Sequence, residues 1–322
     1  MLLDLFKNKK AFKLVCGAGN EDAAEVEKLV ALYSKAGCNY FDLCAKPEIV
    51  DAAKKGLMRA GIENDRYLCV SVGIAGDPHV SKAQINLDKC VNCGKCFEVC
   101  SQNAIINDND NYSVNRMRCI GCGKCFKVCP SDCIERINCS KDLKQVLPEL
   151  IEKGIDCIEL HVVGNDEEEV DAKWADINEL FNGPLCISIE RSKLGTDGIL
   201  DRVQRMIKDR KPYSTIIQAD GIAMSGGDDT YRATLQAVAI AEMFQCANLP
   251  VYLLVSGGTN TKTTQLAKMC DVDIQGVAIG SFARKIVREY IDRDDFFDNK
   301  DVFNKAVKIA KNLVDVSLEY LK

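Results

Sequence analysis

Short apolar runs alternate with longer segments of helical period along most of the chain. The runs that predict strands cover residues 12–18, 39–45, 67–74, 156–163, 185–191, 214–221, 251–258 and 274–281. The segments that predict helices cover residues 21–37, 47–60, 141–153, 166–182, 196–210, 230–246, 261–270, 282–291 and 300–322. Strands and helices that alternate in this way favour parallel β/α units. For helix 21–37, Asn20 is a candidate N-cap and Gly37 a candidate stop.

The number of strands predicts a barrel. Eight strands, and the roughly 260 residues that remain without segment 81–140, match the (β/α)8 fold of about 250 residues. We therefore expect residues 1–80 to form the first part of a barrel, residues 81–140 to form an insertion, and residues 141–322 to complete the barrel. A doubly wound α/β sheet with the same insertion is the alternative, because a strand count alone does not prove closure.

The insertion contains a duplicated cysteine motif. "CVNCGKCFEVC" (90–100) and "CIGCGKCFKVCP" (119–130) share the spacing C-x2-C-x2-C-x3-C. In two-cluster bacterial ferredoxins, the fourth cysteine of each run ligates the other cluster, and we expect it to open a helix. The motif thus predicts two [4Fe–4S] clusters within a ferredoxin-like domain. The expected ligands are Cys90, Cys93, Cys96 and Cys129 for one cluster, and Cys119, Cys122, Cys125 and Cys100 for the other.

Smaller features of the motif refine this interpretation. Gly94 and Gly123 can adopt positive φ and turn backbone N–H groups toward the sulfurs. Ser101 replaces the proline that follows the second run as Pro130. A zinc site or a disulfide framework is the alternative for such thiols, but two runs with ferredoxin spacing favour iron.

Composition limits the remaining possibilities. The net charge of −5 argues against a nucleic-acid-binding surface. We find neither a secretory leader nor an apolar run of membrane-spanning length, so eighteen cysteines indicate a reducing, cytoplasmic location. Cysteines outside the cluster motifs are expected to be small buried hydrophobes. They are Cys16, Cys38, Cys44, Cys69, Cys133, Cys139, Cys157, Cys186, Cys246 and Cys270.

The insertion follows the third strand and so lies in a βα loop at the C-terminal face of the predicted barrel, where barrel enzymes build their sites. The loops after strands seven and eight resemble a phosphate cradle, with helix 282–291 directing its positive end at the ligand. This hypothesis predicts FMN or another phosphate-bearing ligand in the mouth. The residues expected to hold it are Gly257, Gly258, Gly280, Ser281 and Arg284.

Polar residues at other strand ends could line the same mouth. Strand alternation places Glu159 and His161 on the same face of one strand. It likewise places Gln218 and Asp220 on the same face of another. Inward carboxylates require solvent, a partner or a function, although several of these residues could simply cap helices. Asp228 and Asp229 could contact a ligand or cap the next helix, and His79 and His161 receive no catalytic role. The candidates for the mouth are Lys13, Asp42, Ser71, Glu159, Glu190, Gln218 and Asp220.

Three stretches together resemble one family. They are residues 12–53, the segment "GDPHVSKAQIN" that leads into the cysteine motifs, and the group "QADGIAMSGG", "VSGGTN" and "GVAIGSFARK". These motifs are similar to those of the cyanobacterial light-dependent period protein family, over most of the chain and in the same order. The resemblance implies an iron–sulfur protein that reports cellular redox state, linked in cyanobacteria to the period of the circadian clock.

Two functions follow as hypotheses. The first is a redox sensor or electron-transfer protein whose clusters alter binding of an unidentified redox or signalling partner. The second is an oxidoreductase whose barrel binds a flavin or another small phosphate-bearing ligand supplied with electrons by the clusters. A simple electron carrier would not need so large a barrel.

Overall fold

The computed structural model describes residues 1–74, 77, 80–109, 111–139, 142–164, 166–191, 194–222 and 228–321. Eight parallel strands form a closed barrel in the order β1-β12-β11-β10-β9-β8-β3-β2. β1 pairs with both β2 and β12, which confirms the predicted barrel and rules out the doubly wound sheet. The strands are β1 (Ala11–Val15), β2 (Tyr40–Cys44), β3 (Tyr67–Gly73), β8 (Cys157–His161), β9 (Leu185–Glu190), β10 (Thr215–Asp220), β11 (Tyr252–Ser256) and β12 (Gly276–Ile279).

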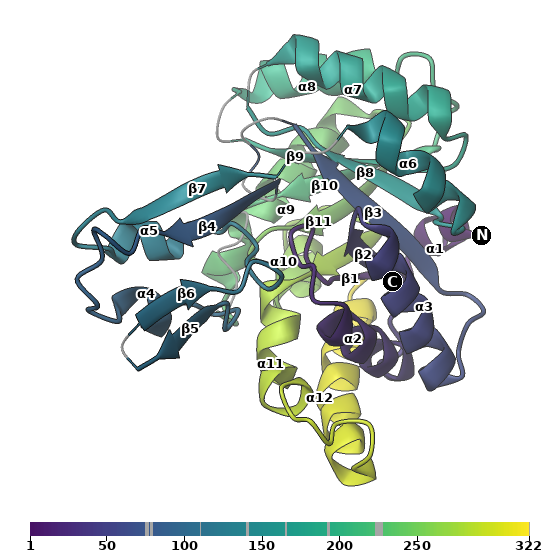
Figure 1. Ribbon diagram of the computed structural model, residues 1–322. Helices are drawn as coiled ribbons and strands as arrows, with labels where there is room; N and C mark the ends of the chain where they lie inside the picture. The colour runs from purple at the N-terminus through teal and green to yellow at the C-terminus, as the bar shows by residue number, and fades with distance from the viewer. Residues whose placement is uncertain are drawn as a thin grey trace.

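Helices surround the barrel where the sequence predicts them (Figure 1). The N-cap of the first of these helices is Asp22, whose side chain accepts from the N–H of Glu25, so the expectation for Asn20 is wrong. Gly37 ends this helix with φ of 101°, as predicted. The surrounding helices are α2 (Ala23–Ala36), α3 (Pro47–Ala60), α6 (Leu143–Glu152), α7 (Glu167–Leu180), α8 (Thr196–Ile207), α9 (Tyr231–Ala247), α10 (Thr263–Met269), α11 (Ser281–Ile291) and α12 (Lys300–Glu319).

The N-terminal end of the barrel is closed by α1 (Leu2–Lys7), a helix that the sequence pattern did not predict. Leu2 and Phe6 are buried against an apolar layer of the barrel interior, and the Phe6 ring meets Tyr40 edge-on at 6.1 Å. Cysteines fill much of this layer as small hydrophobes. The layer consists of Ala11, Tyr40, Cys69, Cys157, Cys186, Ile216, Leu254 and Ala278.

The insertion projects from the barrel as a separate lobe between β3 and α6 (Figure 1). Its first and last strands pair antiparallel, with Ser81 opposite Asn138. A second antiparallel pair lies between the two cysteine runs. The domain boundaries at residues 80 and 140 stay predictions. The lobe contains β4 (Ser81–Ile85), α4 (Lys95–Glu98), β5 (Ile105–Asp108), β6 (Asn111–Val114), α5 (Lys124–Val128) and β7 (Ile134–Asn138).

Cysteines outside the two motifs are mostly buried, as expected. The expectation is wrong for Cys139, Cys246 and Cys270, which are exposed. Among the described residues, no helix combines the length and apolar character needed to cross a membrane.

Candidate redox site and barrel mouth

Each cysteine run is folded around a glycine with left-handed backbone. Gly94 and Gly123 have φ of 74° and 76° and are the N-cap residues of α4 and α5. A side chain on Gly94 would place its Cβ 2.8 Å from the hydroxyl of Tyr112. The third cysteine of each run therefore lies within the helix, and Cys100 and Cys129 come after its end. The expectation that the fourth cysteine opens a helix is wrong.

Thiols from both runs meet in one cavity of about 400 Å³, part of which is open to solvent. Its other walls are largely apolar. The backbone N–H groups of Ala83 and Ala104 donate to the sulfurs of Cys119 and Cys100, each at 3.3 Å. Burial, with a further contribution from the three neighbouring thiols, raises the pKa of Cys125 to about 12. This donor set suits a [4Fe–4S] cluster. We call the cavity the thiol cavity; its cysteines are Cys100, Cys119, Cys122 and Cys125.

The other four predicted ligands are Cys90, Cys93, Cys96 and Cys129. Cys96 is buried, which raises the pKa of its thiol, whereas Cys93 is exposed. The Cys129 sulfur lies 3.5 Å from that of Cys133, a buried thiol outside the motif. Cys133, which follows the second motif closely in the sequence, is thus packed beside a predicted ligand.

Charged side chains fasten the Cys119 loop to the barrel. The buried Lys82 amine donates to the backbone carbonyl of Cys119 at 2.7 Å and to that of Gly19. The Arg118 guanidinium donates to the carboxylate of Asp22 at 2.7 Å. The loop that carries a predicted ligand therefore lies directly against the loop that follows β1.

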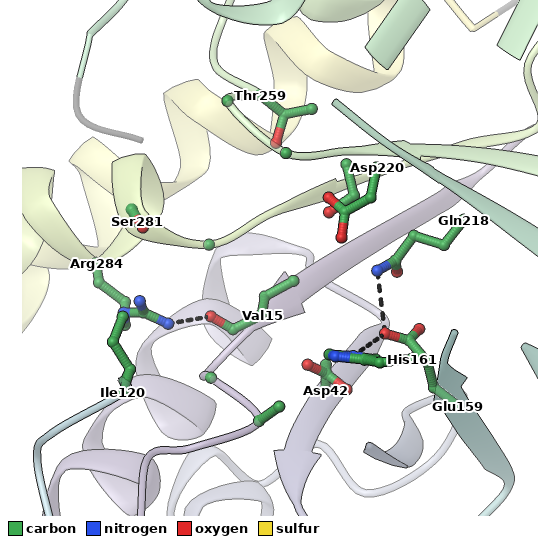
Figure 2. A pocket seen from close by; sticks show the side chains of 16 residues that line it. Val15, Asp42, Ile120, Glu159, His161, Gln218, Asp220, Thr259, Ser281 and Arg284 are labelled. Carbon is green, nitrogen blue, oxygen red and sulfur yellow. Dashed lines mark hydrogen bonds and ion pairs between the residues drawn. The ribbon is translucent and has the colours of Figure 1, made fainter. Parts of the chain in front are cut away.

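The mouth of the barrel holds a pocket of about 630 Å³, part of which is open to solvent (Figure 2). It lies at the C-terminal ends of the strands, and we call it the mouth pocket. Ser71, Glu190 and Lys13 are not part of its lining, although Lys13 lies directly beneath it. The predicted residues that line it are Asp42, Glu159, Gln218, Asp220, Gly257, Gly258, Gly280, Ser281 and Arg284.

Below the mouth pocket, Lys13 is fully buried in a network of polar side chains. Its amine forms an ion pair with Glu159, lies 3.7 Å from Asp42, and donates to the Gln218 carbonyl oxygen at 3.0 Å. Burial lowers the pKa of Lys13, but Glu159 and Asp42 outweigh this effect and hold it well above its ordinary value. Conversely, burial opposes ionisation of Glu159, and Lys13 and His161 hold its pKa well below the usual range. For Asp42, burial dominates and raises the pKa.

His161 connects this network to the pocket. Its Nε2 atom lies 2.9 Å from Glu159, and its Nδ1 atom lies 3.2 Å from Asp77. Burial lowers the pKa of the imidazole, yet the two carboxylates hold it well above the ordinary value. Alternation along the strand correctly placed His161 beside Glu159 but did not reveal a partner from a distant loop. His161 is thus a charged side chain in the wall of the pocket, a position for which the sequence predicted no catalytic role.

The opposite end of the pocket has the features of an anion site. Gly257 and Gly258 have φ of 76° and 78°, and a Cβ on Gly257 would lie 2.5 Å from an Asp220 oxygen. The N-terminus of α11 begins at Ser281. Arg284 is only 2% exposed; its Nη1 donates to the carbonyl of Val15 at 2.7 Å, and its Nε has no hydrogen-bond partner among the described residues.

The acids that follow β10 do not line the mouth pocket. Asp229 accepts from the N–H of Thr261 at 3.1 Å, and the Asp228 carbonyl accepts from Asn260 at 3.0 Å. Thr230 caps α9. These contacts favour the structural interpretation of the two acids. His79 and the residues 223–227 of this loop lie outside the described residues.

A β/α barrel with a ferredoxin-type cysteine insertion defines an iron–sulfur, redox-related protein. Residues 83–136 match the family model for a 4Fe-4S dicluster domain, and residues 149–316 match that for the Light dependent period A C-terminal domain. The chain belongs to the Light dependent period A family, as its sequence motifs indicated. It is 29% identical over 295 residues to Light dependent period A of Synechococcus elongatus, covering 87% of this chain and 82% of the relative.

Solved structures also resemble the chain. The YdjI aldolase from Escherichia coli K12 has a TM-score of 0.49 at 7% identity, covering 99% of this chain and 91% of the aldolase. A truncated 3-deoxy-D-arabino-heptulosonate 7-phosphate synthase from Thermotoga maritima has a TM-score of 0.47 at 11% identity, covering 95% and 86%. Because these TM-scores are below 0.5, the assignment of the barrel fold rests on the strand pairing and not on these similarities.

Proposed function

We propose that this protein senses redox state or transfers electrons through two [4Fe–4S] clusters held beside the barrel mouth. The observation that carries the proposal is the thiol cavity, because its cysteines come from both runs, as the two-cluster pattern requires. Cys90, Cys93, Cys96 and Cys129 would hold the other cluster. Bound clusters would supply one-electron chemistry.

The surrounding residues have definable tasks in such a protein. The N–H groups of Ala83 and Ala104 stabilise charge on two of the sulfurs, which favours the reduced state. Lys82 adds a positive charge beside Cys119 and holds its loop against the barrel. A change of charge at Cys119 would therefore act through Lys82 on the barrel loop at Gly19. The name of the Synechococcus relative, Light dependent period A, supports a link to a light-dependent period, and we propose that this protein relays redox state to a period-setting partner in a cytoplasmic setting.

Anaerobic purification tests the first proposal. About eight iron and eight sulfide per chain, with the absorbance and EPR signals of cubanes, are expected. Cys122→Ala should lose about four iron, whereas Cys246→Ala, which changes an exposed cysteine outside the insertion, should lose none. Zinc in place of iron, or full iron in Cys122→Ala, would overturn the proposal.

A second candidate function is an oxidoreductase with a phosphate-bearing ligand in the mouth pocket. Arg284 favours it, because a buried guanidinium with an unpartnered Nε faces a pocket that also contains two positive-φ glycines and a helix N-terminus. Glu159 and His161 at the other end, and Asp220 beside Gly257, would suit hydroxyl or amine groups of the ligand. If the ligand is FMN, it should copurify and show flavin absorbance after acid removes the clusters. Its absence from protein with full iron content would exclude the flavin.

A further inference from the structure

The thiol cavity and the mouth pocket share one residue among the described residues that line them. Ile120 lines both cavities and is only 6% exposed. It follows Cys119, whose carbonyl is held by Lys82, so its backbone is anchored on the barrel. The two cavities therefore share Ile120 as a common wall.

Gly17 brings Arg284 close to this wall. A Cβ on Gly17 would lie 3.1 Å from the Arg284 Nη1 and 3.6 Å from the Ile120 Cγ2 atom. Because Gly17 has φ of 115° and no side chain, the guanidinium and the isoleucine both approach the position that a Cβ would take, beside the Cβ of Asn20 at 3.3 Å. An anion on Arg284 and a cluster in the thiol cavity would thus be separated by little more than one isoleucine side chain.

The positive charge of Arg284 is also available to a ligand. The neighbouring Glu25 is engaged by Arg288, at 2.7 and 3.1 Å. Within the described part of the chain, Arg284 itself forms no ion pair with a carboxylate. The nearby cations Lys13 and His161 are already matched by Glu159 and by other acids. Among the described residues that line the pocket, the positive charge not paired with a carboxylate is therefore that of Arg284.

We propose that the mouth pocket binds a small phosphate-class anion on Arg284 and that reduction of the adjacent cluster weakens this binding. The inference rests on the proposed function, since it requires a cluster on Cys119 and its partners. Reduction adds one electron to that cluster, supplied by a low-potential reductant such as dithionite, and breaks no covalent bond. The added negative charge repels the anion across Ile120.

Coulomb's law sets the expected size of the effect. At a separation on the order of 10 Å and an effective dielectric constant of about 20, one unit charge changes the affinity for a singly charged anion about tenfold. Linkage is reciprocal, so saturating anion should lower the midpoint potential of this cluster by about 59 mV for a one-electron couple. The potential of the other cluster should change less, because its cysteines line neither cavity.

The test uses the whole protein, loaded with iron and kept anaerobic. Binding of radiolabelled inorganic phosphate is measured by equilibrium dialysis in the oxidised and the dithionite-reduced states. Midpoint potentials are measured by EPR-monitored titration with phosphate and with chloride at equal ionic strength. We expect about tenfold weaker phosphate binding on reduction and a lower potential for one cluster in phosphate.

Variants separate the parts of the inference. Arg284→Gln should abolish both effects, and Arg284→Lys, which keeps the charge, should retain them. Arg293→Gln, an exposed arginine paired with Asp295, should behave as the parent protein. Full iron content without phosphate binding in either state would overturn the ligand site, and equal affinities would overturn the coupling. Absence of clusters would instead overturn the proposed function.

Discussion

The buried ion pair of Lys13 offers a sharp test of how the barrel interior is stabilised. Lys13→Met keeps much of the side-chain volume but removes the charge, so Glu159 and Asp42 lose the amine that compensates them. Both carboxylates are buried, and the Lys13 side chain has no exposed surface. Removing one partner of such a pair costs about 3–5 kcal/mol, because an uncompensated charge remains in the interior.

Urea unfolding, followed by circular dichroism on anaerobic protein, measures this cost. With an m-value of about 3 kcal/mol/M, the midpoint should fall by about 1–1.7 M. Lys9→Met is the matched control, because Lys9 pairs with Asp273 on the surface and should contribute less than about 1 kcal/mol. Adding Glu159→Gln to Lys13→Met should recover part of the loss. If Lys13→Met shifts the midpoint no more than Lys9→Met, the buried pair does not stabilise the barrel as argued.

Three further outcomes are expected. Gly56→Ala should destabilise the protein by about 1–3 kcal/mol, because its Cβ would lie 2.6 Å from the carbonyl oxygen of Glu27 on the adjacent helix; the urea midpoint reports this cost. His161→Gln should lower stability most below about pH 6.5, and the difference from the parent should shrink as pH rises, because the raised pKa of His161 makes its charge stabilising only while it is protonated. Cys133→Ser should leave the iron content unchanged, since Cys133 lies beside a predicted ligand without belonging to the motif.

Each of these outcomes has a clear opposite. Gly195→Ala is the control for Gly56, because nothing lies within 4 Å of its added Cβ, and equal midpoints for the two variants would contradict the steric argument. For His161→Gln, a difference from the parent that grows with pH would reverse the assigned charge. Loss of iron from Cys133→Ser would make Cys133 a ligand.

The fold was predictable because each barrel strand is a short apolar run between helical segments. The helix α1 was missed, since its six residues are too few to establish a period. The glycines and Arg284 at the mouth were predictable because parallel strands bring their carboxyl ends to one face. The pairing of Lys13 with Glu159 was not predictable, because β1 and β8 are not neighbours and meet only across the closed barrel.

The position of Ile120 shows a second limit of the sequence. Its apolar character fits any buried site, and nothing in the motif indicates that it lies between two cavities. That position depends on how the insertion docks, which Lys82 and Arg118 determine through contacts with barrel loops distant in the chain. Such contacts depend on the folded surfaces of the insertion and the barrel, which the local pattern of apolar and polar residues does not describe.

The pairing of β4 with β7 has a consequence for the ancestry of this architecture. Because Ser81 lies opposite Asn138, the chain enters and leaves the lobe at the same point. The barrel closes by direct pairing of β3 with β8, so its ring of strands does not need the lobe. A ferredoxin-coding segment could therefore be gained by an ancestral barrel, or lost from it, in a single genetic event without any change in strand order.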